Sequence, residues 1–405
     1  MAIGRLRVNV LSNDQSHPIP ESVVRINQTG DNNIIFEAVT DESGKTDTFE
    51  LEAPPVDYSL EPETPKPYSE YDVTVENENY EKITIKGVQI LADVTSQQNV
   101  LLNLSSSASQ SVVFEIQEHV LYGDYPEKIA EEEIKPLPSP TGFVVLDSPI
   151  IPEFIIVHDG VPDNANAANY WVPYKDYIKN VCSSEIYPTW PKECIRANAL
   201  AIISFTLNRV YTEWYRSKGY GFTITSSTAY DQKFIYQRNI YEDISVIIDE
   251  IFSTYVTKAN IDQPLFTQYC DGQKVTCPGW LSQWGSKYLA DNGASHLDIL
   301  KNYYSYDIYL ELAKEVAGVP SSYPGEVLQN GSSGSAVRTI QQQLNDISNN
   351  FPAIHKIAID GIYGPNTENA VKIFQSVFDL PETGIVDYAT WYEISKIYVA
   401  VKKLS

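Results

Sequence analysis

A single carboxylate stands out among the residues that could do chemistry. Glu185 lies in the turn SSEIYPTW, and the aromatic residues Tyr187 and Trp190 follow it closely. Contact with aromatic rings removes water from a carboxylic acid and disfavours its charged form, so that the acid can donate a proton near neutral pH. Cleavage of a glycosidic bond requires such a donor. Because the chain has 53 acidic residues, the alternative for a lone glutamate is an ordinary solvated loop residue.

Two predicted helices position this turn. Upstream of it, apolar residues recur at helical spacing from Tyr174 to Val181, and downstream Pro191 suits the first position of a helix. The residues after Pro191 are apolar on two faces, so this helix is expected to be buried on most sides. Roughly 26 residues at 1.5 Å each would make it about 39 Å long, enough for the central pillar of a domain.

Composition limits the class of protein. The 405 residues are enough for two to four domains, and the formal net charge is −24. This charge repels nucleic acid and anionic membranes at long range, so neither is expected as a partner, whereas a neutral sugar is not repelled. The start, MAIGRLRVNVL, alternates like a strand and lacks the apolar core of a signal peptide. No apolar run approaches the roughly 18 residues that span a bilayer.

Residues 1–104 are predicted to form a β-sandwich. Short alternating segments such as residues 23–26 and 71–75 are separated by turn sequences such as DESG at 41–44. No nucleophile is grouped with a base here, so we expect no catalysis from this part. The order PIPESVVRI, TDESGKTDTFEL and YDVTVENENYEKITIKGVQI resembles the carboxypeptidase-regulatory-like, transthyretin-like sandwich.

The composition changes after the predicted sandwich. Residues 105–150 contain a Ser-rich bridge and then the sequence GDYPEKIAEEEIKPLPSPTG. Proline and clustered glutamate oppose a packed core, so this stretch is predicted to be an exposed linker. Exposure and loose packing are what proteolytic nicking requires, and we expect such cleavage between about residues 123 and 150.

Residues 151–320 are predicted to form a central α/β (α+β) catalytic domain. After the long helix, the alternating stretch FTITSSTAYDQKFIY is expected to bring Ser226 and Ser227 to a strand edge. A helix around residues 244–255, a strand at PLFTQYCDG and two helices split at Asn292-Gly293 follow. Several strand ends and the turn with Glu185 are therefore expected to meet in one cleft.

Four blocks in this region follow one another in a specific order. The first, VCSSEIYPTWPKECIRANALAIISFTL, contains a valine, the glutamate, a Trp-Pro pair and an alanine-rich helix. The others are DQ at 231–232, the stretch 266–272, and SQWG at 282–285 leading to ILKNYY at 299–304. This order resembles the stage II sporulation protein D family of lytic transglycosylases over about residues 151–312. The resemblance implies that Glu185 is the catalytic acid.

The expected cleft and the resemblance together give a set of residues predicted to bind substrate. They are Tyr187, Trp190, Ser226, Ser227, Asp231, Gln232, Ser282, Gln283 and Trp284.

The four cysteines leave the metal content open. Some members of the family bind zinc with Cys and His in this region, and Cys270 and Cys277 could ligate zinc if two more ligands came from elsewhere. The nearest histidine, His296, is predicted to lie on a helix. A disulfide or two plain thiols are the preferred alternatives, so no cofactor is expected. Cys182 and Cys194 are expected to be packing residues.

Residues 326–405 form a third predicted unit, with apolar residues at helical spacing. The sequences DGIYG at 360–364 and GIVD at 384–387 each precede a helical pattern, and the full set resembles the small three-helix peptidoglycan-binding domain. The same glycines and aspartates also make ordinary caps and turns. The residues expected to contact peptidoglycan are Asp360, Tyr363, Thr367, Gln375, Asp387 and Trp391.

The order of the three parts resembles the clostridial spore cortex-lytic enzymes. The resemblance implies a germination enzyme at the spore cortex or coat that cleaves cortex peptidoglycan between N-acetylmuramic acid and N-acetylglucosamine and leaves 1,6-anhydro ends. It also implies a zymogen with the β-sandwich as pro-region and a germination protease as activator. Two alternatives stay open. One is a muramidase or glucosaminidase with Asp231 or Asp271 as second acid, and the other is a non-catalytic cortex-binding protein.

Overall fold

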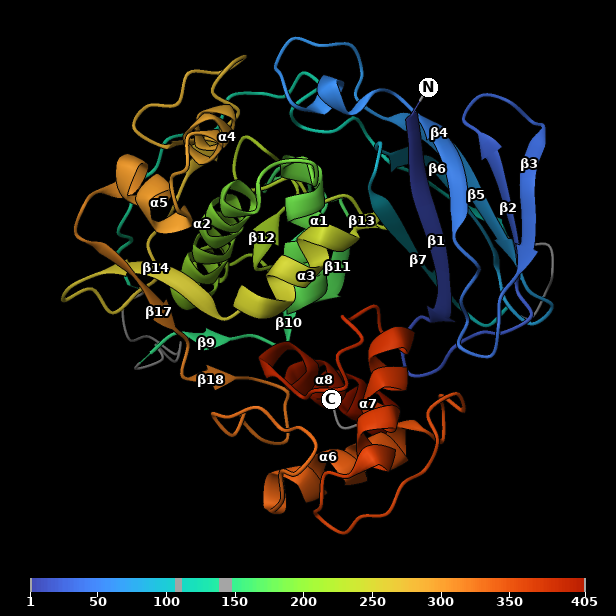
Figure 1. Cartoon of the computed structure of the whole chain (residues 1–405). Coiled ribbons are helices and arrows are strands. Elements are labelled where there is room, and N and C mark those ends of the chain that lie inside the picture. The colour runs from blue at the N-terminus through green and yellow to red at the C-terminus, as the bar shows by residue number, and fades with distance from the viewer. Residues whose placement is uncertain (1, 106–110, 138–147, 404–405) are drawn as a thin grey trace. The chain divides into compact units, whose positions relative to one another are not determined.

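The computed structural model describes residues 2–105, 111–137 and 148–403 (Figure 1). Residues 138–147, which hold part of the expected cleavage region, lie outside the described residues. The chain divides into two compact units. One, which we call the central unit, contains residues 54–67 and 117–317, and the other contains residues 3–53, 68–116 and 318–405. The expected multidomain α+β organisation is confirmed, but residues 54–67 and 117–137 belong with the central helices and not with the sheets or a free linker.

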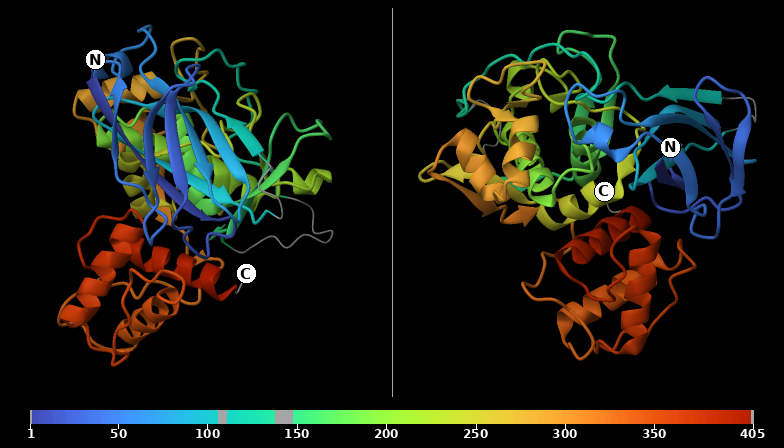
Figure 2. Two further views of the ribbon diagram at one scale, coloured as in Figure 1. Left: turned by 90° about the vertical axis from the view of Figure 1, so that its right-hand side faces the viewer. Right: turned by 45° about the horizontal axis from the view of Figure 1, so that its top comes forward.

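The N-terminal part is rich in sheet, as predicted. In one sheet, β7 (Thr95–Leu102), β1 (Ala2–Ser12) and β4 (Phe49–Ala53) lie side by side in that order, and β1 pairs with β7 in parallel. A second sheet has the order β3 (Ile34–Val39), β2 (Val23–Gln28), β5 (Ser69–Glu76), β6 (Lys82–Ile90), β8 (Ser111–Glu115). Alternate residues such as Leu6, Val8 and Val24 are fully buried, which is why the alternating sequence forms strands here. The strands of this part are drawn in blue in the left view of Figure 2.

Five helices form the middle of the central unit. They are α1 (Tyr174–Glu185), α2 (Lys192–Tyr211), α3 (Glu242–Ile251), α4 (Gln283–Asp291) and α5 (His296–Tyr304). Helix α2 is buried on nearly all sides and forms the core pillar, as its two apolar faces predicted. It has 20 residues, which makes it about 30 Å long and shorter than expected, because the chain turns at Thr212 before the predicted end. The split between α4 and α5 at Asn292-Gly293 is confirmed.

Short sheets surround these helices and carry the loops of the site. They are β11-β10-β12 (Asn169–Pro173, Phe154–His158, Ile224–Thr225), β14-β17 (Thr254–Lys258, Ile308–Leu312), β15-β16 (Tyr269–Cys270, Leu281–Ser282) and β18-β9 (Glu315–Val316, Ile150–Ile151). The residues expected to continue a helix to position 255 instead enter β14, because Thr254 to Lys258 pair with β17.

The C-terminal part contains the three predicted helices α6 (Ser335–Ile347), α7 (Pro365–Val377) and α8 (Tyr388–Lys402). Two glutamines hold equivalent turns. The Gln341 side chain bonds the N–H of Gly361 and the hydroxyl of Thr367, and the Gln375 side chain bonds the N–H of Gly384 and the hydroxyl of Thr390. This part therefore contains an internal repeat of one turn and one helix start.

Among the described helices, none combines the length and the apolar character needed to cross a bilayer.

Candidate active site

Glu185 is the last residue of α1 and is only 2% exposed. The prediction placed it in the turn after that helix, but the helix continues through it. Three donors hold its carboxylate. Oε1 accepts hydrogen bonds from the backbone N–H of Lys233 at 2.9 Å and from the hydroxyl of Tyr269 at 3.3 Å, and Oε2 accepts one from the amide of Gln283 at 3.2 Å. The acid therefore has a fixed orientation.

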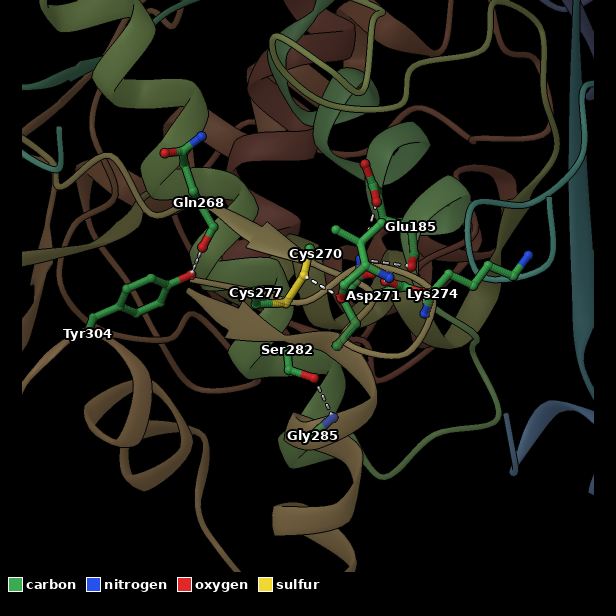
Figure 3. The surroundings of a disulfide bond; sticks show 11 residues. Glu185, Gln268, Cys270, Asp271, Lys274, Cys277, Ser282, Gly285 and Tyr304 are labelled. Carbon is green, nitrogen blue, oxygen red and sulfur yellow. Dashed lines mark hydrogen bonds between the residues drawn. A yellow bond between two sulfur atoms is a disulfide. The ribbon is translucent and has the colours of Figure 1, made fainter. Parts of the chain in front are cut away.

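The short β15-β16 pair brings two of these donors together. Tyr269 is the first residue of β15 and pairs with Leu281 of β16, and Gln283 begins α4 directly after β16. Ser282 caps α4 by accepting a hydrogen bond from the N–H of Gly285 (Figure 3). The cap sets the first turn of α4, and this turn directs Gln283 towards Glu185.

Burial controls the charge of the groups around Glu185. It raises the pKa of Tyr269 well above its ordinary value, and the nearby negative charge of Glu185 raises it further. Tyr269 therefore stays protonated and can serve as a donor. Burial also lowers the pKa of Lys233 and of Lys128, although the negative charge of Glu185 opposes this in both cases.

Cys270 and Cys277 form a disulfide that closes the loop beside Glu185 (Figure 3). Inside this loop, Asp271 accepts hydrogen bonds from the N–H groups of Lys274 at 2.8 Å and Val275 at 2.9 Å. The bonded sulfurs do not offer the two thiolates that zinc would need. Over the described ranges, no group of three or more Cys, His, Asp or Glu side chains is arranged to hold a metal. The residues present therefore do not fit a zinc site.

Residues 117–137, which we call the strap, cover the Glu185 carboxylate. Five strap residues, Val120, Gly123, Tyr125, Pro126 and Lys128, line a cavity of about 50 Å³ together with Glu185, Asp271 and Gln283. This volume has room for a water molecule or two and not for a sugar ring. The glutamate is therefore closed off from a glycan in the chain as described.

Hydrogen bonds fasten the strap along its length, which corrects the expectation of a loosely packed linker. The Gln268 side chain bonds the C=O of Ile129 and the N–H of Glu131, and the Gln263 side chain bonds both the N–H and the C=O of Lys135. The ammonium of Lys128 lies 4.7 Å from the centre of the Tyr269 ring. Partners far away in the sequence satisfy the polar backbone of the strap, so it packs although it is rich in proline and glutamate.

Asp231 and Gln232 lie near Glu185 but have other partners. Both are fully buried. Asp231 bonds Arg209, Tyr215 and Thr225, and Gln232 bonds Tyr177 and Thr206. These two residues therefore position the segment that carries the N–H of Lys233, and neither is free to bind substrate as predicted.

The remaining predicted substrate residues surround the site without lining its cavity. Tyr187, Trp190 and Trp284 form a buried aromatic cluster with ring centres 4.9–6.3 Å apart. Ser226 bonds Asp159, and the carbonyl of Ser227 accepts the N–H of Asp231. Of the nine residues predicted to bind substrate, only Gln283 reaches the cavity. Sequence reasoning missed Tyr269 and Lys233, although Tyr269 lies within the third family-like block.

The residues predicted to contact peptidoglycan in the C-terminal part are mostly internal. Tyr363, Thr367, Gln375 and Trp391 are buried, and Asp387 caps α8 by accepting the N–H of Thr390. Asp360 is exposed and accepts hydrogen bonds from Gln341 and from the N–H of Ile362. Burial leaves little of the four internal side chains for contact with a glycan. Thr367 joins α7 to Gln341 of α6, and Gln375 joins α7 to Thr390 of α8.

Two family models match this chain. Residues 163–257 match a family described as stage II sporulation protein, and residues 333–394 match a putative peptidoglycan binding domain. The buried Glu185 lies within the residues that match the stage II sporulation protein family. Together the matches support a sporulation-related cell-wall lytic protein with a peptidoglycan-binding domain. Each model covers less than half of the chain.

Individual relatives match shorter stretches. A zinc D-Ala-D-Ala carboxypeptidase of Streptomyces albus G is 39% identical over 71 residues, which are 17% of this chain and only 26% of that protein. A crystal structure of the SleB N-terminal domain is 27% identical, covers 19% of this chain and 99% of that chain, and has a TM-score of 0.17. A Klebsiella pneumoniae 5-hydroxyisourate hydrolase is 15% identical over 25% of this chain and 99% of that chain, with a TM-score of 0.17.

Proposed function

We propose that this chain is a spore cortex-lytic enzyme of the clostridial SleC type, which acts as a lytic transglycosylase on cortex peptidoglycan and is made as a zymogen. The observation that carries the proposal is the buried Glu185, held by three donors inside the stretch that matches the sporulation family. The C-terminal match supports peptidoglycan as the partner.

Glu185 would supply both proton transfers. Its proton passes to the glycosidic oxygen as the bond from that oxygen to C1 of N-acetylmuramic acid breaks, and positive charge develops at C1. The C6 hydroxyl of the same sugar then attacks C1, and its proton returns to Glu185. No water is consumed, so a second carboxylate to activate water is not needed. Tyr269 and Gln283 act as positioning residues that keep the carboxyl group in place through both steps.

A hydrolytic enzyme is the second candidate, because Asp271 lines the same cavity as Glu185. Asp271 accepts two backbone N–H bonds within its own loop, which favours a structural role. The mass of the products separates the two reactions. The transglycosylase product carries an anhydro end and is lighter by one water than the hydrolysed product. If purified cortex digested by the activated chain yields only reducing ends, the transglycosylase assignment fails.

The strap supports the zymogen part of the proposal, and we assign the inhibition to it and not to the β-sandwich. Two versions of the full chain test this, one with a specific protease site placed within residues 106–110 and one with it within residues 138–147. Cleavage at 106–110 leaves the strap attached to the central unit and is expected to give little activity. Cleavage at 138–147 cuts the strap from residues 148–317 and is expected to activate. Equal activation by both cuts would indicate that the β-sandwich, and not the strap, inhibits the enzyme.

A further inference from the structure

The guanidinium of Arg209 on α2 presents a carboxylate-binding face to the strap. Its Nε donates to Asp231 at 2.8 Å, which fixes the plane of the group. Its two terminal nitrogens donate to the two oxygens of Glu131, at 3.1 and 2.6 Å. This paired geometry is the strong and specific way in which arginine binds a carboxylate. Arg209 itself is 1% exposed.

Glu131 belongs to the strap, so its carboxylate leaves with the strap. Asp231 cannot replace it, because its second oxygen already accepts hydrogen bonds from Tyr215 at 2.7 Å and from the N–H of Thr225 at 2.9 Å. Arg209 would then keep Asp231 and, through Nη2, the carbonyl of Tyr230 at 3.1 Å, while the N–H groups that face Glu131 would open to solvent. Because Asp231 still fixes the plane of the guanidinium, these N–H groups stay placed to bind another carboxylate in paired geometry.

The wall beside this face carries groups that suit a glycan. In the uncleaved chain a cavity of about 700 Å³ lies here, and strap residues between 129 and 136 form one side of it, so departure of the strap would open the other side. The central unit contributes Trp214, Tyr220 and Tyr230, whose ring faces suit the apolar faces of a sugar. It also contributes Lys218, whose ammonium lies 3.3 Å from the centre of the Trp214 ring, and Asp163, which is bonded to Tyr220.

The strap also connects the surroundings of this face with those of the acid. Lys128 packs on the Tyr269 ring, which bonds Glu185, and Glu131 reaches Arg209 only three residues later. Three extended residues span at most about 11 Å. From the other side, Asp231 bonds Arg209 and the N–H of Lys233, two residues on, bonds Glu185. The arginine and the acid therefore contact neighbouring residues on both segments, the strap and residues 231–233.

We propose that Arg209, helped by Lys218, binds a carboxylate of the glycan substrate once the strap has left, and that Glu131 occupies this place in the uncleaved chain. The inference rests on the proposed function and adds a substrate group to it. The shared chemistry is a carboxylate, and two sources carry it in peptidoglycan. One is the lactyl group of a peptide-free N-acetylmuramic acid, and the other is a carboxylate of an attached peptide.

The test uses the full chain cut at 138–147 and glycans that differ only in their carboxyl groups. Peptide-free glycan is compared with the same glycan after its lactyl carboxylates have been amidated, and peptide-bearing glycan with its amidated form. We expect amidation to raise KM roughly ten- to hundredfold for the form that carries the recognised carboxylate, with little change in kcat. If only the peptide-free pair differs in KM, the recognised carboxylate is the lactyl group. If only the peptide-bearing pair differs, it belongs to the peptide. Equal KM values within both pairs would overturn the proposal.

Variants assign the effect to Arg209. Arg209→Lys should remove most of the difference between native and amidated glycan, whereas Arg216→Gln, which changes an exposed arginine nearby, should preserve it. Persistence of the difference in a folded Arg209→Lys protein would overturn the assignment. Should Arg209→Lys not fold, a synthetic peptide of residues 126–136 gives the answer. It should inhibit the cut wild-type chain at least tenfold better than its Glu131→Gln form, and equal inhibition would contradict the proposal.

Binding without turnover keeps this inference separate from the proposed reaction. The cut chain with Glu185→Gln should still bind native glycan more tightly than amidated glycan. If the cut wild-type chain cleaves nothing but this preference is present, the reaction fails and the carboxylate site stands. If cleavage occurs but native and amidated glycan bind equally well, the reaction stands and the carboxylate site fails.

Discussion

The side-chain amide of Gln283 donates to Glu185 twice, at 3.0 Å to its backbone carbonyl and at 3.2 Å to its carboxylate. One residue at the start of α4 thus fixes both the end of α1 and the acid that it carries.

Gln283→Met should lower kcat by roughly tenfold or more while the protein remains folded, because the carboxylate loses one orienting donor. KM should change much less, since the amide faces the acid. The pH profile of kcat should also shift, which a purely structural defect would not cause. Gln273→Met, which changes an exposed glutamine in the neighbouring loop, is the matched control. Unchanged kcat in Gln283→Met would contradict its positioning role.

Glu185→Gln should reduce cleavage by at least about 10²–10⁴-fold, because an amide cannot cycle a proton. The new NH₂ group replaces one carboxylate oxygen and would face the donors to that oxygen, either Lys233 and Tyr269 or Gln283, so we also expect a loss of about 1–3 kcal/mol in the free energy of unfolding. Product release from the cut chain and thermal unfolding measure the two effects. A folded variant with near wild-type cleavage would place the acid elsewhere.

Gly272→Ala should disrupt the loop closed by the disulfide. Gly272 has φ +78°, and an added Cβ would lie 1.8 Å from the hydroxyl oxygen of Ser282, the cap of α4. Gly279→Ala is the matched control, since Gly279 has φ +76° but nothing within 4 Å of the new atom. Both variants carry the cost of a left-handed residue, about 1–2 kcal/mol. Gly272→Ala should lose at least about 1–3 kcal/mol more through the clash. Equal free energies of unfolding for the two variants would show that the loop can shift away from Ser282 and avoid the clash.

Strap docking should strengthen between pH 8 and 10.5 through Lys135. Burial lowers the pKa of Lys135 to about 8, from an ordinary 10.5, although Glu131 opposes the shift. The released strap then binds more protons than the docked strap in this window, so stability rises with pH there and is level below pH 8. The gain is at most about 3 kcal/mol. The difference in unfolding free energy between wild type and Lys135→Met should therefore grow across this range, and parallel curves would contradict the prediction.

Deleting residues 326–405 should weaken adhesion to insoluble cortex more than cleavage of soluble glycan fragments. A tethered binding domain raises the local concentration of substrate without taking part in the chemistry. Pelleting with purified cortex and product release from soluble fragments measure the two effects on the chain cut at 138–147. An equal loss in both would show that these residues support the fold of the central unit.

Local patterns in the sequence were enough to predict much of the fold. The apolar faces of α2, the turns before α7 and α8, and the alternation of the N-terminal strands depend on neighbours a few residues away, so composition and spacing predict them. Glu185 was found in the same way, from its place between two helices.

The strap, the disulfide and the donors to Glu185 were decided only by the tertiary structure. The sequence of the strap has no regular period, and its polar groups bond Gln263 and Gln268 more than 120 residues later. The pairing of Cys270 with Cys277 and the approach of Tyr269 to Glu185 depend on how β15 and β16 lie against α1. Arg209 resembles a surface residue at the end of a helix in the sequence, and only its burial between Asp231 and Glu131 gives it a role. Contacts between distant segments set these features, and no local spacing encodes them.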